Sequence, residues 1–132
     1  MKKENKKVLD CMSKKTKEAR EEARQILKKG ILDMSIGRLI QMSECGLCGY
    51  IDFESETTMV QNSFNCIDYD EESDVITFIR KETDENCYCA VSFIVASIIE
   101  ISGCEDADEP DKFLNINIKL DDDTTIEIQI LY

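Results

Sequence analysis

One stretch, from Cys87 to Ile101, constrains the fold more than any other because it is the most apolar run in the chain. Twelve of its fifteen residues are apolar, and the exceptions are Ser92, Ser97 and Glu100. Most of the apolar residues are β-branched or aromatic, which favours a strand on a packed, pleated surface. Because both of its faces are apolar, the run predicts a strand that is covered on both sides. Its length predicts a bulge or break near Ala96–Ser97.

The chain from Gly49 onward has strand and turn patterns, which are clearest at its end. Large aliphatic residues alternate with polar ones through 113–120 and 124–132, and Asp121–Asp123 connect the two segments. This pattern predicts a hairpin with one buried and one solvated face. Four further strands are predicted at 50–53, 59–69, 75–80 and 87–101. Because the connections are short, we expect an antiparallel meander of about six strands.

The segment before these strands predicts helices, so the fold class is α+β. Residues 4–29 place apolar and small side chains on one face at three- and four-residue steps. These residues are Val8, Met12, Thr16, Ala19, Ala23, Ile26 and Leu27. Gly30, after two lysines, predicts the end of this helix. The apolar face is thin, so the helix is expected either to pack weakly on its own body or to pair with another copy, as a homodimer.

Residues 31–45 allow two interpretations. They predict either a second short helix, capped by Asp33 or Ser35 and stopped by Gly46, or an irregular connector. Gly37 weakens the helical interpretation by about 1 kcal/mol relative to alanine.

The charge of the chain is divided very unevenly along its length. Residues 1–30 contain eleven Lys/Arg and five Asp/Glu, and residues 31–132 contain five Lys/Arg and 23 Asp/Glu. The sequence therefore predicts a basic amphipathic helical arm at 1–30 and one acidic α+β body at 31–132. Such asymmetry bears on partners rather than on fold. We expect a protein partner with a basic surface, and no direct binding of nucleic acid, because the acidic body repels phosphate.

Several classes of function lack the residues that they need. The chain contains no histidine, which removes the usual general base and the histidine-containing metal sites. It has neither G-x-x-x-x-G-K-[ST] nor G-x-G-x-x-G. We therefore expect no enzymatic activity and no cofactor. There is no apolar segment of roughly 18 residues and no secretory signal, so we expect no membrane association. With seven cysteines, an odd number, the sequence predicts a cytoplasmic protein.

The cysteines permit three interpretations. Cys45 and Cys48 have the spacing of a redox pair or of half a zinc site, and Cys87 and Cys89 could supply two more thiolates. The chain lacks the βαβ context of a thioredoxin-like motif, and a turn is a more usual place for zinc ligands than a strand. We prefer the third interpretation, in which these cysteines are small structural residues.

Acidic residues gather in the predicted turns. The run from Asp68 begins like a calcium loop, but Ser73 stands where that loop needs glycine and Ile79 where it needs glutamate. In a single meander every second turn falls at the same end of the sheet, so the turns at 68–74 and 103–112 should meet. Ten carboxylates are then predicted to form a partner-binding surface: Asp68, Asp70, Glu71, Glu72, Asp74, Glu105, Asp106, Asp108, Glu109 and Asp111. The opposite end should collect Glu54, Glu56, Glu82, Asp84, Glu85, Asp121, Asp122 and Asp123.

These features favour a non-enzymatic binding protein. Its acidic surface would mimic nucleic acid and block a basic nucleic-acid-binding protein, since a mimic needs closely spaced negative charges. Small acidic chains of similar composition include phage inhibitors of the anti-restriction and anti-CRISPR type. The alternatives are a small zinc-binding or redox protein that uses the four cysteines, or an acidic domain whose charge serves solvation.

Overall fold

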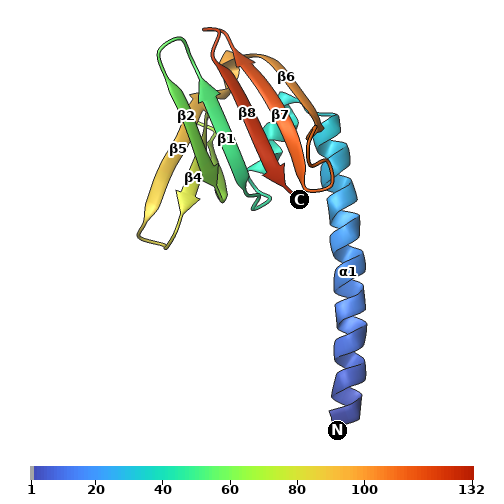
Figure 1. Ribbon diagram of the computed structural model, residues 1–132. Coiled ribbons are helices and arrows are strands. Elements are labelled where there is room, and N and C mark those ends of the chain that lie inside the picture. Colours follow the sequence, from blue (N-terminus) through green and yellow to red (C-terminus); the bar gives the residue numbers. More distant parts are fainter. Residues whose placement is uncertain (1) are drawn as a thin grey trace.

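The computed structural model describes the backbone of residues 2–132 and the side chains of residues 17–88 and 91–132. Two helices precede the strands, which confirms the predicted α+β class (Figure 1). The helices are α1 (Lys2–Leu32) and α2 (Ile36–Met42). The strands are β1 (Gly49–Glu54), β2 (Met59–Phe64), β3 (Cys66–Asp70), β4 (Val75–Lys81), β5 (Cys87–Ile94), β6 (Ile98–Glu105), β7 (Phe113–Leu120) and β8 (Thr125–Leu131).

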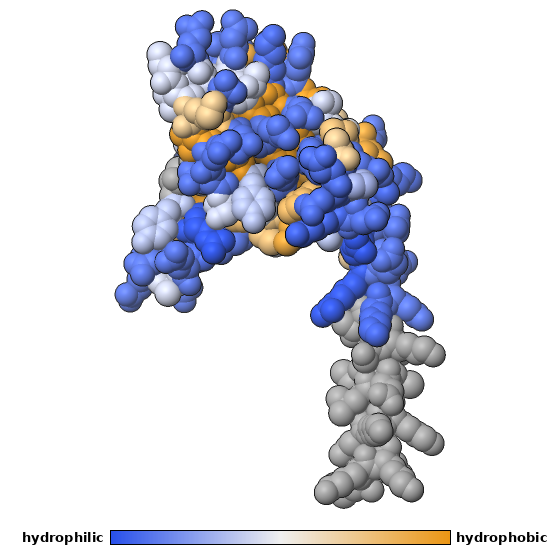
Figure 2. Space-filling model, in the orientation of Figure 1, coloured by the Kyte–Doolittle hydropathy of each residue, from blue (hydrophilic) through white to orange (hydrophobic). Residues whose placement is uncertain are grey.

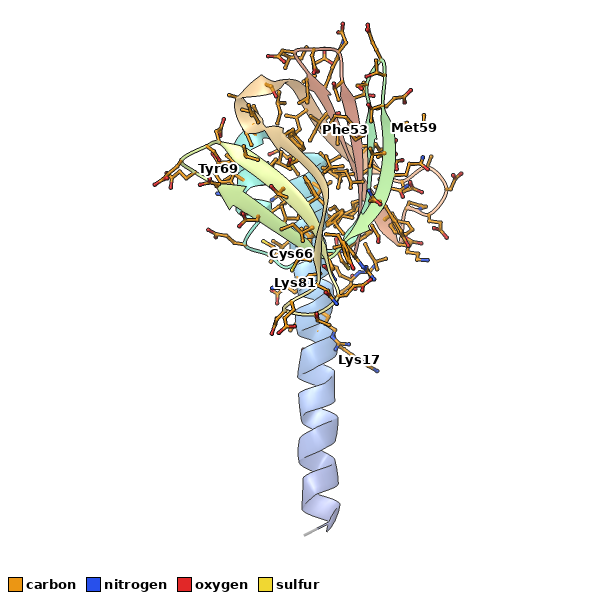
Figure 3. All side chains as sticks on the ribbon, turned by 90° about the vertical axis from the view of Figure 1, so that its left-hand side faces the viewer. Lys17, Phe53, Met59, Cys66, Tyr69 and Lys81 are labelled. Atoms are coloured by element: carbon orange, nitrogen blue, oxygen red, sulfur yellow. The ribbon has the colours of Figure 1, made fainter. Side chains whose placement is uncertain are left out.

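The number of strands and their pairing differ from the predicted meander. Eight strands form two antiparallel sheets: a five-stranded sheet in the order β2-β1-β8-β7-β6 and a three-stranded sheet in the order β3-β4-β5. Figure 3 views the two sheets from the side, with Phe53 and Met59 on the larger sheet and Tyr69, Cys66 and Lys81 on the smaller one. The large side chains between the layers form the core.

The first additional reversal is at Asn65, inside the segment that was predicted as one strand. Asn65 donates a side-chain hydrogen bond to the Lys81 carbonyl (2.7 Å) and accepts one from the Lys81 N–H (2.8 Å). The amide of Asn65 thereby pairs with the end of β4 as a backbone group would. Residues 59–64 consequently belong to one sheet and residues 66–70 to the other.

The second additional reversal interrupts the apolar run. A 3₁₀ turn at Val95–Ser97 ends β5, and the chain resumes as β6 in the other sheet, so the predicted break is confirmed. The expectation that this run is covered on both sides is wrong. Val91 and Phe93 are buried, but Ile94 is 52% exposed and Ile99 is 56% exposed. Each strand buries one face because its sheet has a single covered side.

The C-terminal hairpin confirms its predicted pattern and supplies much of the core. Ile116 and Ile128 are paired in register and fully buried, and Ile51 of β1 lies opposite Ile128. From the other sheet, Phe78 packs edge-to-face on Phe64, with their ring centroids 5.0 Å apart. The two sheets are therefore joined by direct apolar contact, which accounts for one shared core.

One of the two helices ends at a different residue from the one predicted. The short helix α2 is confirmed, and the Ser35 hydroxyl caps it by accepting a hydrogen bond from the Arg38 N–H. However, α1 does not end at Gly30 but continues to Leu32, because Ile31 is drawn into the core and is 1% exposed. Opposite it, Gly103 of β6 has its Cα so close to α1 that a Cβ would lie 1.7 Å from the Ile31 carbonyl oxygen.

Figure 1 shows that α1 lies against the sheet at its C-terminal end and extends away from it toward the N-terminus. Within the described part of the chain, neither helix has the length and apolar character that crossing a membrane requires.

Candidate functional site

The ten carboxylates that were predicted to share one surface lie at opposite ends of the fold. The β3–β4 turn is held to the β5–β6 junction, because Asp74 accepts hydrogen bonds from the N–H groups of Val95 and Ala96. The β6–β7 loop begins at the other end of β6, which is eight residues or about 25 Å long. The predicted single surface is therefore wrong.

The error has a simple geometric cause. Each reversal of the chain moves the next turn to the opposite end, and the reversal at Val95–Ser97, which lies between the two turns, was predicted only as a break within one strand. We call the end that holds the turns at 55–58, 71–74 and 121–124 the distal end. Its turns are linked, since Ser97 accepts a hydrogen bond from the Asp121 N–H (2.9 Å) and Glu54 lies opposite Thr125.

The opposite end, where the β6–β7 loop lies against α1, is called the helix end. Its acidic residues are partly neutralised by the basic arm. Lys28 forms an ion pair with Glu105 (2.6 Å), and this hydrogen bond raises the pKa of Lys28. Arg24 donates to the Asp111 carbonyl (2.8 Å) and stacks over the Tyr132 ring at 4.7 Å. The arm thus binds part of the predicted surface within its own chain.

Asp106 has a structural role in the same loop. Its Oδ1 accepts hydrogen bonds from the amides of Asn115 (3.0 Å) and Gln129 (3.2 Å). Its Oδ2 accepts from the N–H groups of Asp108 and Glu109. These bonds lower the pKa of Asp106, and the bond from Asn115 has the largest effect. Asp106 therefore fastens the loop to β7 and β8, and its carboxylate is already engaged.

Two more of the predicted residues build the β3–β4 turn. Asp70 accepts hydrogen bonds from the Glu72 N–H and the Ser73 hydroxyl. Asp74, which has a positive φ of 57°, also accepts one from Tyr69 Oη (2.6 Å), and this bond raises the pKa of Tyr69 to about 12. The remaining carboxylates of the predicted set are exposed and form no hydrogen bond or ion pair with a described residue: Asp68, Glu71, Glu72, Asp108, Glu109 and Asp111.

A different acidic surface lies on the solvent side of the five-stranded sheet, which we call the outer face. Asp52 of β1 and Glu127 of β8 are directly opposite each other in the register. Gln61 flanks Asp52, and Asn117 flanks Glu127, so that one polar row crosses four strands. Like charges directly opposite each other on a sheet are destabilising. This carboxylate pair therefore lowers the stability of the fold, and solubility alone does not require two carboxylates at opposed positions.

The pair lies in a shallow hollow of about 390 Å³ on the outer face. Glu54 and Glu100 add two more carboxylates to its lining, beside Lys119. Among the described side chains, Asp52 and Glu127 have no Lys or Arg within ion-pair distance, whereas Lys119 is 4.0 Å from Asp123. Figure 2 views this side and shows many hydrophilic residues on it, with an apolar area between them in the upper part.

The chemistry of this hollow suits a cationic side chain. Carboxylates and neutral amides side by side accept hydrogen bonds from a guanidinium, which is planar and carries five donors. Sequence reasoning missed the site, although Asp52 and Glu127 are outward positions in alternating strands. That alternation was interpreted only as a solvated face.

The cysteines do not come together as a ligand set within the described side chains. Cys45 and Cys48 flank Gly46 in the turn after α2, and Cys87 begins β5. The thiol of Cys45 donates to the Gln41 carbonyl and that of Cys87 to the Thr83 carbonyl. No group of three potential metal ligands occurs among the described residues. Cys89 lies outside the described side chains.

Comparison of the chain with protein-family models, with curated proteins and with solved structures finds no match.

Proposed function

We propose that this protein is a non-enzymatic binding protein whose outer face engages a basic surface of a protein partner. In this proposal it acts as an inhibitor, because it occupies a site at which the partner would hold nucleic-acid phosphates. The observation that carries the proposal is the Asp52–Glu127 pair, which faces solvent in the centre of the sheet and forms no ion pair with any described Lys or Arg side chain.

Charge is the second support. The body at 31–132 has 23 Asp/Glu against five Lys/Arg, and the arm neutralises the helix end but not the outer face. Adjacent strands hold opposed side chains about 5 Å apart, and successive outward residues on one strand about 7 Å apart. Duplex DNA carries one charge per about 1.7 Å of its axis. A sheet with acidic rows is a rigid way to present closely spaced negative charges.

The absence of histidine supports the non-enzymatic part of the proposal. We further propose that the protein acts in the cytoplasm. The described cysteines Cys45, Cys48, Cys66, Cys87 and Cys104 are all free thiols, which fits a reducing compartment.

The proposal is tested by displacement of DNA from a basic ligand. A short arginine-rich peptide is bound to a fluorescent DNA duplex, and the protein is added as competitor. The wild type should release the DNA, and the release should weaken as salt is raised, because exposed charges are screened beyond about 8–10 Å.

Two double variants distinguish the outer face from general acidity. Asp52→Asn with Glu127→Gln removes two charges from the outer face, and Glu71→Gln with Glu72→Gln removes two from the distal end. The first should be the weaker competitor, whereas the second should resemble the wild type. If both variants compete as well as the wild type does, the outer face is not the binding site.

A further inference from the structure

A groove between α1 and α2 is lined mostly by apolar surface. It has a volume of about 1040 Å³ and is lined by residues of both helices and of the turn after them. Ala23, Ile26 and Ile31 lie on the α1 side, and Met34 and Met42 lie on the opposite side. A groove of this kind suits an amphipathic helix.

The apolar stripe of α1 that leads into this groove is not used by its own body. Arg24 and Lys28 contact the β6–β7 loop, and Ile31 is buried in the core. Ile26, by contrast, is 70% exposed, and Ala19 and Ala23 are exposed as well. The helix therefore docks on its body by one face and presents a second face that continues the groove.

This second face follows a regular spacing. Ala19, Ala23, Ile26 and Gly30 are separated by alternating four- and three-residue steps, and the sequence continues the same steps backward through Thr16, Met12 and Leu9. Such a heptad spacing is the signature of two helices packed side by side. The small residues would allow a close approach. With 31 residues, α1 is about 46 Å long, and Figure 1 shows much of it extending beyond the sheets.

We propose that the occupant of this groove is the α1 helix of a second copy of the chain, in an antiparallel, two-fold symmetric pair. In the register that places Thr16 opposite Ala19, Met12 lies opposite Ala23 and Leu9 lies opposite Ile26. The positions of Leu9 and Met12 in the helix of each copy then lie along the groove of the other. An isologous contact of this type closes on itself and buries both stripes at once.

Charge complementarity selects a second copy over an unrelated apolar partner. In this register Lys15 of one copy flanks Glu22 of the other, an oppositely charged pair that occurs twice by symmetry. The lysine-rich start of each helix is also brought to the acidic body of the other copy, where 31–132 holds 23 Asp/Glu. This inference does not rest on the proposed function, since the outer face is not part of the helical pair.

The test is the mass of the full-length protein by sedimentation equilibrium over a range of concentrations. The wild type should be a dimer. Ile26→Glu places a charge in the apolar seam and should raise the dimer dissociation constant by about tenfold or more. Because Ile26 is largely exposed in a single copy, this variant should keep the wild-type circular dichroism. Ile94→Glu is the matched control: Ile94 is 52% exposed on β5, and its substitution should leave the dimer intact.

The register is tested by exchanging charges. Lys15→Glu alone and Glu22→Lys alone should each weaken the dimer by about 2–30-fold, and the double variant should restore it, since an exposed ion pair contributes about 0.2–1 kcal/mol and the pair occurs twice. A wild-type protein that is monomeric at every concentration overturns the proposal. So does an Ile26→Glu variant as dimeric as the wild type, and failure of the double variant to recover overturns the antiparallel register.

Discussion

Substituting Gly103 with alanine tests how α1 is joined to the sheet. The added Cβ would lie 1.7 Å from the Ile31 carbonyl oxygen and 2.7 Å from the Ile31 carbonyl carbon. Both are backbone atoms, so no side-chain rotation relieves the overlap. The ordinary carbon–oxygen contact distance is about 3.3–3.6 Å, so the last turn of α1 must move away from β6 by more than about 1 Å.

The free-energy cost follows from what that movement disrupts. Ile31 is 1% exposed, and full burial of an isoleucine stabilises a protein by about 1.5–3 kcal/mol. Overpacking destabilises the protein by about 1–3 kcal/mol. Because the last turn of α1 can relax in part, the two losses do not add in full. Replacing a strand glycine also recovers about 0.5–1 kcal/mol of chain entropy. The expected net loss is about 1.5–3 kcal/mol, which is a substantial part of the usual stability of about 5–15 kcal/mol.

Urea unfolding followed by circular dichroism measures this loss, with Gly37→Ala as the matched control. Gly37 is exposed in α2, and a Cβ there would approach nothing closer than the Ser35 hydroxyl at 4.0 Å. Alanine at this position should be neutral or stabilise by up to about 1 kcal/mol. If Gly103→Ala unfolds at the same urea concentration as the wild type, α1 does not pack on β6 as described.

Three further predictions concern the core, the loop and the arm. Phe93→Ala should destabilise the protein by about 2–5 kcal/mol, measured by urea unfolding, and a change below about 0.5 kcal/mol would contradict its place in the core. The lowered pKa of Asp106 predicts that the wild type is more stable than Asp106→Asn above the unfolded-state pKa of about 4. That advantage should shrink as the pH falls through the folded-state pKa, so acid titrations of the two proteins should converge, and parallel curves would contradict the role of this carboxylate. Deleting residues 1–22 should leave cooperative unfolding, because the described α1 side chains that bond to the body, Arg24 and Lys28, lie beyond this segment, and a non-cooperative transition would show that the arm belongs to the core.

Local patterns predicted several elements of the fold correctly. The alternation around Ile116 and Ile128 predicted the C-terminal hairpin, Ser35 was a candidate cap for α2, and the length of the apolar run predicted the break at Val95–Ser97. The reversal at Asn65 could not be predicted in the same way. It rests on one side chain that bonds to Lys81, which is distant in sequence, and the residues on both sides have strand character.

The location of the acidic surface was lost through the other reversal, at Val95–Ser97, which was predicted only as a break within one strand. Placing turns at the ends of a sheet requires the correct number of reversals between them, so missing this one put 68–74 and 103–112 at the same end. The roles of Asp74 and Asp106 were also hidden, because their partners are brought to them by tertiary structure. The Asp52–Glu127 pair needed the β1–β8 register, which joins the first strand to the last and has no local signal.

Binding of an arginine-rich peptide, followed residue by residue in amide NMR spectra, tests most directly whether the outer face is a binding site. A peptide of the same length with glutamine in place of arginine is the control. The account predicts that the arginine peptide shifts the signals of Asp52, Gln61, Asn117 and Glu127 at low salt and that the glutamine peptide does not. Substituting Asp52→Asn together with Glu127→Gln should abolish these shifts. Equal shifts at every exposed acidic turn, or shifts confined to Glu71 and Glu72, would contradict the account.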